Sequence, residues 1–317
     1  MRPEVLVLDL DGTLRDLEAT DGRIPPATIS ALLRAIEAHP KLRLIINTGQ
    51  TLEHVLGLLL QALGRSLLHS GRLAVVYERG VGVYLPGPDS THKLLLFAEL
   101  DWRLLRAFDR ARARILQICS AELGRGCLDY HIPGSEFNLA VKPNAPEGSA
   151  SAKAVTRAAA PLLVRALAYA ASEETELESA TLEAALLVYL RAQDPRNAEV
   201  LPKPFADSPE PPDWLSVSMF YYPGNMTGLS AIDLTKVNGL RAVLRYWGLV
   251  KPPTLVLGDG REDLELMREV AAWAGGRVAC PANTRRDVLA FVRATGGAVY
   301  PVGQAERVLT WSGLLEA

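Results

Sequence analysis

The sequence has few cysteines and no long uninterrupted hydrophobic run. Its three cysteines, Cys119, Cys127 and Cys280, are an odd number and lack the C-x-x-C or Cys/His spacing of a zinc site. We therefore expect reduced, structural thiols in a cytoplasmic protein. The apolar run Val5–Leu8 is too short for the core of a signal peptide. The more apolar stretch at 158–171 contains a proline and an arginine, so no membrane association is expected.

The sequence also lacks an excess of charge of either sign. Its 34 Lys+Arg residues and 36 Asp+Glu residues give a formal net charge of −2, which does not favour nucleic acid as a partner. Only seven of the basic residues are lysines, so a lysine within a motif is a candidate functional residue. With 317 residues, 49% of them hydrophobic, the chain is long enough for two folded domains. The oligomeric state stays open between monomer and homodimer.

Strand and helix signals alternate at both ends of the chain. The segment Glu4–Leu10 contains a continuous run of valine and leucine at 5–8, as expected of a strand buried on both faces of a parallel sheet. Further strands are predicted at 41–47, 73–77, 81–85, 254–257 and 277–280. A helix is expected after Pro25 and Pro26, with apolar positions at helical spacing between Ile29 and Ile36, and others at about 52–63, 262–272 and from 284. This order predicts an α/β fold with a Rossmann-like parallel sheet.

The middle of the chain has a different pattern of predicted elements. A Pro-Gly-Pro-Asp sequence, which is typical of a loop, begins at Pro86. After it we expect a helix at about 100–123, a strand at 137–141, an alanine-rich helix at 151–171 and strands at 214–222 and 229–234, while 182–192 fits either a helix or a strand. We therefore predict a core formed by residues 1–85 and 229–317, with an inserted α/β (α+β) domain at 86–228.

Acidic and polar residues follow three of the predicted core strands. Asp9 and Asp11 end the first strand, Thr48 and Gly49 end the second, and Asp259 and Asp263 follow the strand at 254–257. Ligands bind beyond the carboxyl ends of the strands in open α/β sheets, so we expect four carboxylates and one hydroxyl at one rim. Clustered carboxylates stay ionised only beside a cation, and a set of oxygen ligands without His or Cys favours Mg²⁺.

These segments together resemble the haloacid dehalogenase (HAD) superfamily of phosphatases. The matching segments are LVLDLDGTL at 6–14, LIINTGQT at 44–51, DLTKVNGL at 233–240 and LGDGREDLELM at 257–267. The position of the insertion resembles that of the type C2 (subclass IIB) cap found in Cof-like and sucrose-phosphate phosphatases. The resemblance implies a Mg²⁺-dependent phosphatase that hydrolyses a small phosphorylated metabolite, such as a sugar phosphate or a phosphoglycerate derivative, through an aspartyl phosphate.

The resemblance also implies roles for particular residues. Asp9 would be the nucleophile and Asp11 the general acid and base, and these functions suit carboxylates. Thr48 and Lys236 would bind the phosphate oxygens, with Leu10 and Gly49 beside them. The metal ligands would be Asp9, the main-chain carbonyl of Asp11, Asp259 and Asp263. Lys236 is one of few lysines, and its compact ammonium would fit as a point-charge phosphate binder at a position where a planar guanidinium would clash.

Two alternative functions stay open. Glu262 stands where the fourth motif usually has asparagine, which would add negative charge close to a phosphate site. A weakened protein that only binds phosphorylated ligands therefore stays an alternative, as does a phosphomutase similar to phosphomannomutase. In the inserted domain, four residues are candidates for recognising the leaving group: Glu136, Asn138, Lys142 and Lys203.

Overall fold

The computed structural model of the chain divides into two compact units. The first comprises Met1–Phe97 and Leu234–Ala317, and the second comprises Ala98–Asp233. The structure describes residues 1–15, 23–68, 70–80, 82–86, 92–96, 101–130, 138–204, 208–231 and 235–316.

The first unit is built on an eight-stranded sheet with the order β12-β11-β10-β1-β2-β3-β4-β5. Strands β12 to β3 of this order run parallel, while β4 and β5 are antiparallel additions at one edge. The strands are β1 (Val5–Leu8), β2 (Arg43–Asn47), β3 (Leu73–Tyr77), β4 (Gly82–Pro86), β5 (His92–Leu96), β10 (Thr254–Leu257), β11 (Arg277–Pro281) and β12 (Ala298–Tyr300). The helices are α1 (Pro26–Ala38), α2 (Leu52–Leu68), η1 (Glu78–Gly80), α7 (Lys236–Tyr246), α8 (Arg261–Ala271), α9 (Arg286–Ala294) and α10 (Glu306–Trp311).

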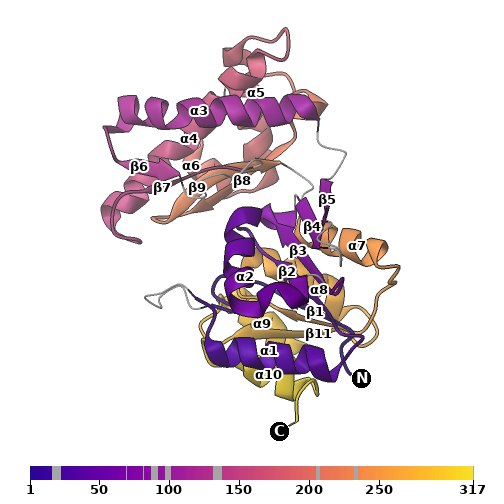
Figure 1. Cartoon of the computed structure of the whole chain (residues 1–317). Coiled ribbons are helices and arrows are strands. Elements are labelled where there is room, and N and C mark those ends of the chain that lie inside the picture. The colour runs from indigo at the N-terminus through magenta and orange to yellow at the C-terminus, as the bar shows by residue number, and fades with distance from the viewer. Residues whose placement is uncertain are drawn as a thin grey trace. The chain divides into compact units, whose positions relative to one another are not determined.

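Helices cover both faces of this sheet (Figure 1). Side chains alternate along β1, so that Leu6 and Leu8 pack in a core with α1, α2 and α10. Val5 and Val7 pack in a second core with α7, α8 and α9 on the opposite face. Burial on both faces explains why these strands are apolar throughout, as predicted for a parallel sheet.

The second unit has an antiparallel sheet with the order β6-β7-β9-β8. Helix α4 packs against α3 and α5, and it also packs on β7 and β9. The strands are β6 (Leu128–Tyr130), β7 (Asn138–Pro143), β8 (Val217–Tyr222) and β9 (Met226–Ala231). The helices are α3 (Trp102–Leu123), α4 (Ala150–Ser172), α5 (Ser179–Gln193), α6 (Asn197–Val200) and η2 (Asp213–Leu215). The predicted α/β fold class is confirmed, with a second unit of mixed α and β structure.

The structure differs from the expected boundaries in two places. Strand β5 continues the first sheet beyond residue 86, where we placed the start of the insertion. Residue 229, where we placed the return to the core, lies within β9 of the second sheet. The segment 182–192, which left helix and strand open, is helical in α5. The predicted strand start at Phe137 lies outside the described residues.

The apolar stretch at 158–171 belongs to α4, which continues through Pro161. Among the described residues this is one helix whose length and composition would allow it to cross a membrane, but most of its apolar segment is buried inside the protein. Burial in the second unit accounts for its hydropathy, as expected of a core helix.

Candidate active site

The carboxyl ends of β1, β2, β3 and β10 meet at one edge of the first sheet. The chain moves from β1 to β2 and β3 on one side, whereas β10, β11 and β12 lie on the other side of β1. The order of strands therefore reverses at β1, and ligands bind at such a switch point in open α/β sheets. Asp9 follows β1 directly, and its backbone N–H donates to the carbonyl of Leu257 at the end of β10 over 3.0 Å.

Asp9 lies in a buried network of charged side chains. The Lys236 ammonium donates to Oδ1 of Asp9 over 2.6 Å and to Oδ1 of Asp263 over 2.7 Å. Lys236 is 4% exposed and Asp263 is 2% exposed, so the lysine links two carboxylates in an interior position. The hydroxyl of Thr13 lies 3.3 Å from Oδ2 of Asp9 and 3.4 Å from Oδ1 of Asp259.

Two glycines allow Asp259 and Asp263 to approach the backbone closely. A Cβ atom on Gly12 would lie 2.3 Å from an oxygen of Asp259, and Gly12 has a φ of +76°, which favours glycine. A Cβ atom on Gly258 would lie 2.4 Å from the side chain of Asp263. Oδ2 of Asp263 accepts from the backbone N–H groups of Asp259 and Gly260 over 3.1 and 2.9 Å, which fixes this carboxylate at the start of α8.

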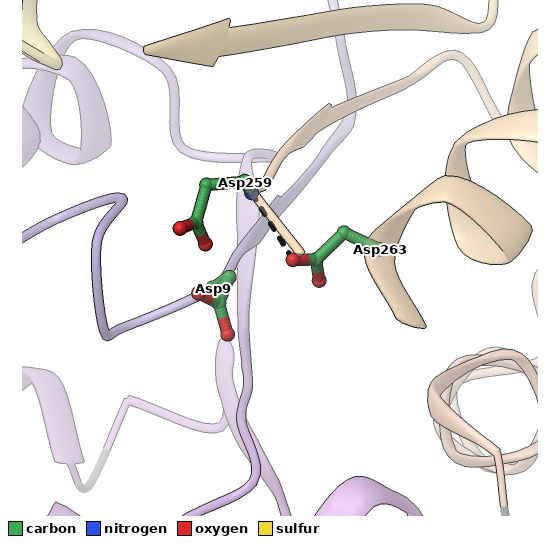
Figure 2. Close-up of side chains that lie close together, drawn as sticks. All are labelled: Asp9, Asp259 and Asp263. Carbon is green, nitrogen blue, oxygen red and sulfur yellow. Dashed lines mark hydrogen bonds between the residues drawn. The ribbon is translucent and has the colours of Figure 1, made fainter. Parts of the chain in front are cut away.

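The carboxylates of Asp9, Asp259 and Asp263 point toward a common space (Figure 2). One oxygen from each lies within 4.8 Å of the others. Burial raises the pKa of Asp259 to about 6, and the charge of Asp263 adds to this. Burial also raises the pKa of Asp9 well above its ordinary value, although Lys236 opposes the shift. Burial acts against the charge of Lys236, but Asp263 and Asp9 outweigh it and raise the pKa of this ammonium.

This donor set fits a hard divalent cation. All the ligand atoms are oxygens, and a cation would favour the ionised forms of Asp9 and Asp259, whose pKa values burial and the neighbouring carboxylates raise. The oxygen-only set therefore suits Mg²⁺ better than zinc. The side chain of Asp11, the fourth expected carboxylate, lies outside this cluster of three.

Asp11 instead forms an ion pair with Arg15. The side-chain amide of Gln50 also donates to Oδ2 of Asp11 over 2.5 Å. The Arg15 guanidinium reaches Nε2 of His54 over 3.1 Å, so this ring nitrogen accepts and the imidazole is neutral. Burial lowers the pKa of His54, and the charge of Arg15 lowers it further. The Asp11 side chain keeps 22% of its surface exposed, whereas Asp9 is 6% exposed.

Helix α7 carries Lys236 at its first position, and three contacts hold its start in place. The side chain of Thr235 caps the helix by accepting from the backbone N–H of Asn238 over 3.3 Å. The buried amide of Asn47 donates to the carbonyl of Lys236 over 2.9 Å. A Cβ atom on Gly239 would lie 2.2 Å from Val76, so only glycine allows the helix to pack this close to β3.

Thr48 and Gly49 follow β2 at the same edge. Thr48 is 1% exposed, and its hydroxyl accepts from the backbone N–H of Gln50 over 3.2 Å. The nearest atoms to a Cβ on Gly49 belong to the side chain of Arg79, at 3.7 and 3.9 Å. Leu10 is fully buried in the core with α1 and α2, so only its backbone is near the site.

The candidate recognition residues belong to the second unit. Asn138 is 2% exposed in β7, and its carbonyl accepts from Arg112 over 3.3 Å. Lys142 is exposed at the other end of the same strand, and Lys203 is exposed in the segment before η2. Glu136 lies outside the described residues. Their roles in recognition stay predictions.

Sequence reasoning missed four polar side chains at this edge of the sheet: Arg15, Asn47, Gln50 and Arg79. Arg15, Asn47 and Gln50 lie in or near strand ends that we singled out, whereas Arg79 follows β3, which we did not; none has a residue type that marks chemistry by itself. The pairing of Glu262 with Arg79, with Oε1 and Nε 3.3 Å apart, also escaped prediction. The negative charge that Glu262 adds to the fourth motif is therefore balanced locally.

Comparison with known proteins gives similarity at the level of the fold. No family model and no curated protein sequence matches the chain. Among solved structures, it is similar to a haloacid dehalogenase-like hydrolase from Bacteroides thetaiotaomicron, with 14% identity, a TM-score of 0.56 and coverage of 98% of this chain and 99% of the other. It is also similar to a HAD subclass IIB sugar phosphatase, with 14% identity, a TM-score of 0.52 and the same coverage. A Thermotoga maritima protein, TM0651, has 14% identity, a TM-score of 0.53 and coverage of 100% and 98%.

The matches extend over nearly the full length of the chain and of each neighbour. The chain therefore shares the fold of these haloacid dehalogenase-like proteins over nearly its whole length. The predicted resemblance is confirmed for the fold.

Proposed function

We propose that the chain is a Mg²⁺-dependent phosphatase that hydrolyses a small phosphorylated metabolite through an aspartyl phosphate on Asp9. The observation that carries the proposal is the environment of Asp9. This residue lies at the switch point of a parallel sheet, between Lys236 and Thr13 and beside two further carboxylates. The same fold in solved phosphotransferases and in a sugar phosphatase supports this class of reaction.

In the first step, an oxygen of Asp9 attacks phosphorus and the bond from phosphorus to the leaving oxygen breaks. The leaving alkoxide takes a proton from Asp11, which is more exposed than Asp9 and so better placed to meet the substrate. For this step Asp11 has to be protonated and released from its ion pair with Arg15, while the side-chain amide of Gln50 contacts its other oxygen. Lys236 and Thr13 orient the Asp9 carboxylate for attack.

In the second step, water attacks the phosphorus of the aspartyl phosphate. Asp11, now ionised, takes a proton from this water, and the bond from phosphorus to Asp9 breaks to release inorganic phosphate. Both side chains return to their starting protonation states. Thr48 and the backbone at Gly49, with Lys236, are the proposed donors to the oxygens of the phosphoryl group that carry charge in both steps.

Mg²⁺ would be held by Asp9, Asp259 and Asp263. When bound it would supply positive charge that favours ionised carboxylates and the phosphoryl oxygens. Within the chain, Asp263 also has a structural task, because it anchors Lys236 and accepts two backbone N–H groups.

The inserted domain is the proposed source of specificity for the leaving group. A sugar phosphate or a phosphoglycerate derivative is the proposed substrate class, in line with the sugar phosphatase that shares the fold. Two alternatives from the sequence would use parts of the same site: a phosphomutase would use the same nucleophile, and a binding protein would bind the same ligands.

The test is a panel of phosphorylated metabolites assayed for phosphate release, with and without Mg²⁺. The wild-type protein should release phosphate only with the metal. Asp9→Asn should lower the rate by several orders of magnitude, because it removes the nucleophile. The matched control is Asp109→Asn, which changes an exposed aspartate on α3 of the second unit.

Three results would contradict the proposal. Full activity of Asp9→Asn would exclude Asp9 as the nucleophile. Interconversion of sugar 1- and 6-phosphates without free phosphate would favour the mutase instead. Tight binding of the panel with no turnover would favour the binding protein.

A further inference from the structure

The turn after β3 has an unusual backbone at the edge of the proposed phosphate site. Glu78, Arg79 and Gly80 have φ angles of 46°, 63° and 101°, so three successive residues are left-handed. Only glycine adopts this region freely, and each of the other two residues costs about 1 kcal/mol or more. Strain of this kind persists only where the surrounding structure imposes it.

Contacts on both sides impose this turn. The backbone N–H of Glu78 donates to the carbonyl of Gln50 over 2.9 Å, and that of Arg79 donates to the carbonyl of Thr48 over 3.0 Å. On the other side, a Cβ on Gly80 would lie 2.1 Å from the carbonyl oxygen of Thr235, which caps the helix that carries Lys236. The turn is therefore clamped between the two elements that would bind phosphate oxygens.

The side chain of Arg79 lies across this edge. It packs against Gly49, where its Cγ and Nε atoms are 3.7 and 3.9 Å from the position of a Cβ. Its Nε lies 3.3 Å from Oε1 of Glu262 in the first turn of α8, one residue before Asp263. The Arg79 side chain is 13% exposed and that of Glu262 is 35% exposed, so the pair is partly screened from water.

We propose that Arg79 is a second cationic phosphate-binding residue, which contacts the phosphoryl group on the Thr48–Gly49 side, and that Glu262 positions it. This inference rests on the proposed function, because it assumes that Thr48 and Gly49 face the phosphate. A planar guanidinium fits phosphate oxygens through two parallel hydrogen bonds, and one ion pair at Nε fixes its plane. Glycine or asparagine would suit the left-handed backbone at position 79 better than arginine does. The presence of arginine in this strained turn is the observation that points to a ligand.

The simplest alternative is that Arg79 only neutralises Glu262. Both readings predict weaker phosphate binding when Arg79 is lost, because an unpaired glutamate would repel the anion. They differ for the double variant. If Arg79 contacts phosphate, removing the charge of Glu262 as well does not replace the contact. If Arg79 only neutralises Glu262, removing both charges restores the site.

The experiment measures the affinity of inorganic phosphate by calorimetry in the presence of Mg²⁺, with Tm as a second readout. The variants are Arg79→Asn, Glu262→Gln and the double variant, with Arg34→Gln as a control on the exposed face of α1. Asparagine tolerates the left-handed region, so Arg79→Asn should fold with a Tm equal to or above that of the wild type.

We expect Arg79→Asn and the double variant both to bind phosphate at least tenfold more weakly than the wild type. Arg34→Gln should bind like the wild type, and Glu262→Gln should weaken binding only while Arg79 is present. Wild-type affinity in the double variant, or in Arg79→Asn, would overturn the proposal. The same variants in the phosphate-release panel separate the two hypotheses: a wild-type protein that releases no phosphate contradicts the proposed function, whereas normal hydrolysis by Arg79→Asn contradicts the role of Arg79.

Discussion

Replacing Lys236 with methionine should destabilise the protein strongly at neutral pH. Methionine is close to lysine in length, so the change removes the charge without leaving a large cavity. At an effective dielectric constant of 20, each of the contacts from the ammonium to Asp9 and Asp263, at 2.6 and 2.7 Å, is worth about 6 kcal/mol before the cost of burial. Removing one partner of a buried ion pair has a net cost of about 3–5 kcal/mol.

This cost converts into a measurable fall in Tm. A change of 1 kcal/mol shifts Tm by about 2–4 °C in a folded unit of 150–250 residues, so Lys236→Met should lower Tm by on the order of 10 °C. Scanning calorimetry or urea denaturation without metal, at pH 7.5, measures it. The matched control is Lys142→Met, because Lys142 is exposed on β7 and its loss should leave Tm unchanged.

The effect should depend on pH in a direction that the charges determine. The pKa of Lys236 is raised from 10.5, so its contribution to stability is complete at all lower pH values and is lost only as pH rises through the raised value. Between pH 7.5 and pH 5 the lysine therefore stays charged, whereas the carboxylates left by the variant gain protons. The deficit of Lys236→Met should shrink at pH 5. Equal Tm values for the variant and the wild type at pH 7.5 would refute the assigned network.

Three further predictions concern single groups. Gly49→Ala should keep the wild-type Tm, because the nearest atoms to the new Cβ are 3.7 Å away. It should lower kcat/KM at least tenfold, because the proposed phosphate occupies that space. Unchanged kinetics would place the phosphate elsewhere. The apparent affinity for Mg²⁺, measured by calorimetry, should fall about tenfold for each pH unit below 6. Burial raises the pKa of Asp259 to about 6, so below this pH its carboxyl has to lose a proton before it binds the metal. An affinity that does not vary between pH 5 and 7 would contradict this. Burial raises the pKa of Cys119 to about 12 and that of Cys280 to about 11. A thiol reagent at pH 8 should therefore label Cys127 first and the two buried cysteines only on unfolding. Rapid labelling of all three would show that the buried thiols are accessible.

The core strands could be predicted because burial on both faces makes them apolar without interruption. Strands β1, β2 and β10 occur where such runs were found. Short edge elements gave no comparable signal. Strand β5 follows a Pro-Gly-Pro sequence that indicates a loop, and it becomes a strand through pairing with β4. Helix α5 was ambiguous because its sequence is apolar on most sides, and packing against α4 decides its structure.

The positions of the site residues could be anticipated only as far as strand order determines them. The ends of parallel strands meet at one edge, which is why Asp9 and Asp259 lie close together although they are far apart in the sequence. Contacts between particular side chains could not be anticipated in this way. The pairing of Arg79 with Glu262 requires a left-handed turn after β3 and a particular orientation of α8, and neither leaves a residue pattern by itself.

The charges of the site also explain why a scarce lysine and a divalent cation should both be needed. Asp9, Asp259 and Asp263 carry three negative charges when ionised, and Lys236 supplies one positive charge. The two neighbouring arginine–carboxylate pairs are neutral by themselves. The metal-free cluster thus has a formal charge of −2, and repulsion between its carboxylates adds to the effect of burial in raising the pKa values of Asp9 and Asp259. A divalent cation cancels this charge and a monovalent one does not. Without that cancellation, a phosphate dianion would have to approach a site of its own sign, so the cation should raise affinity for phosphate as well as the rate of hydrolysis.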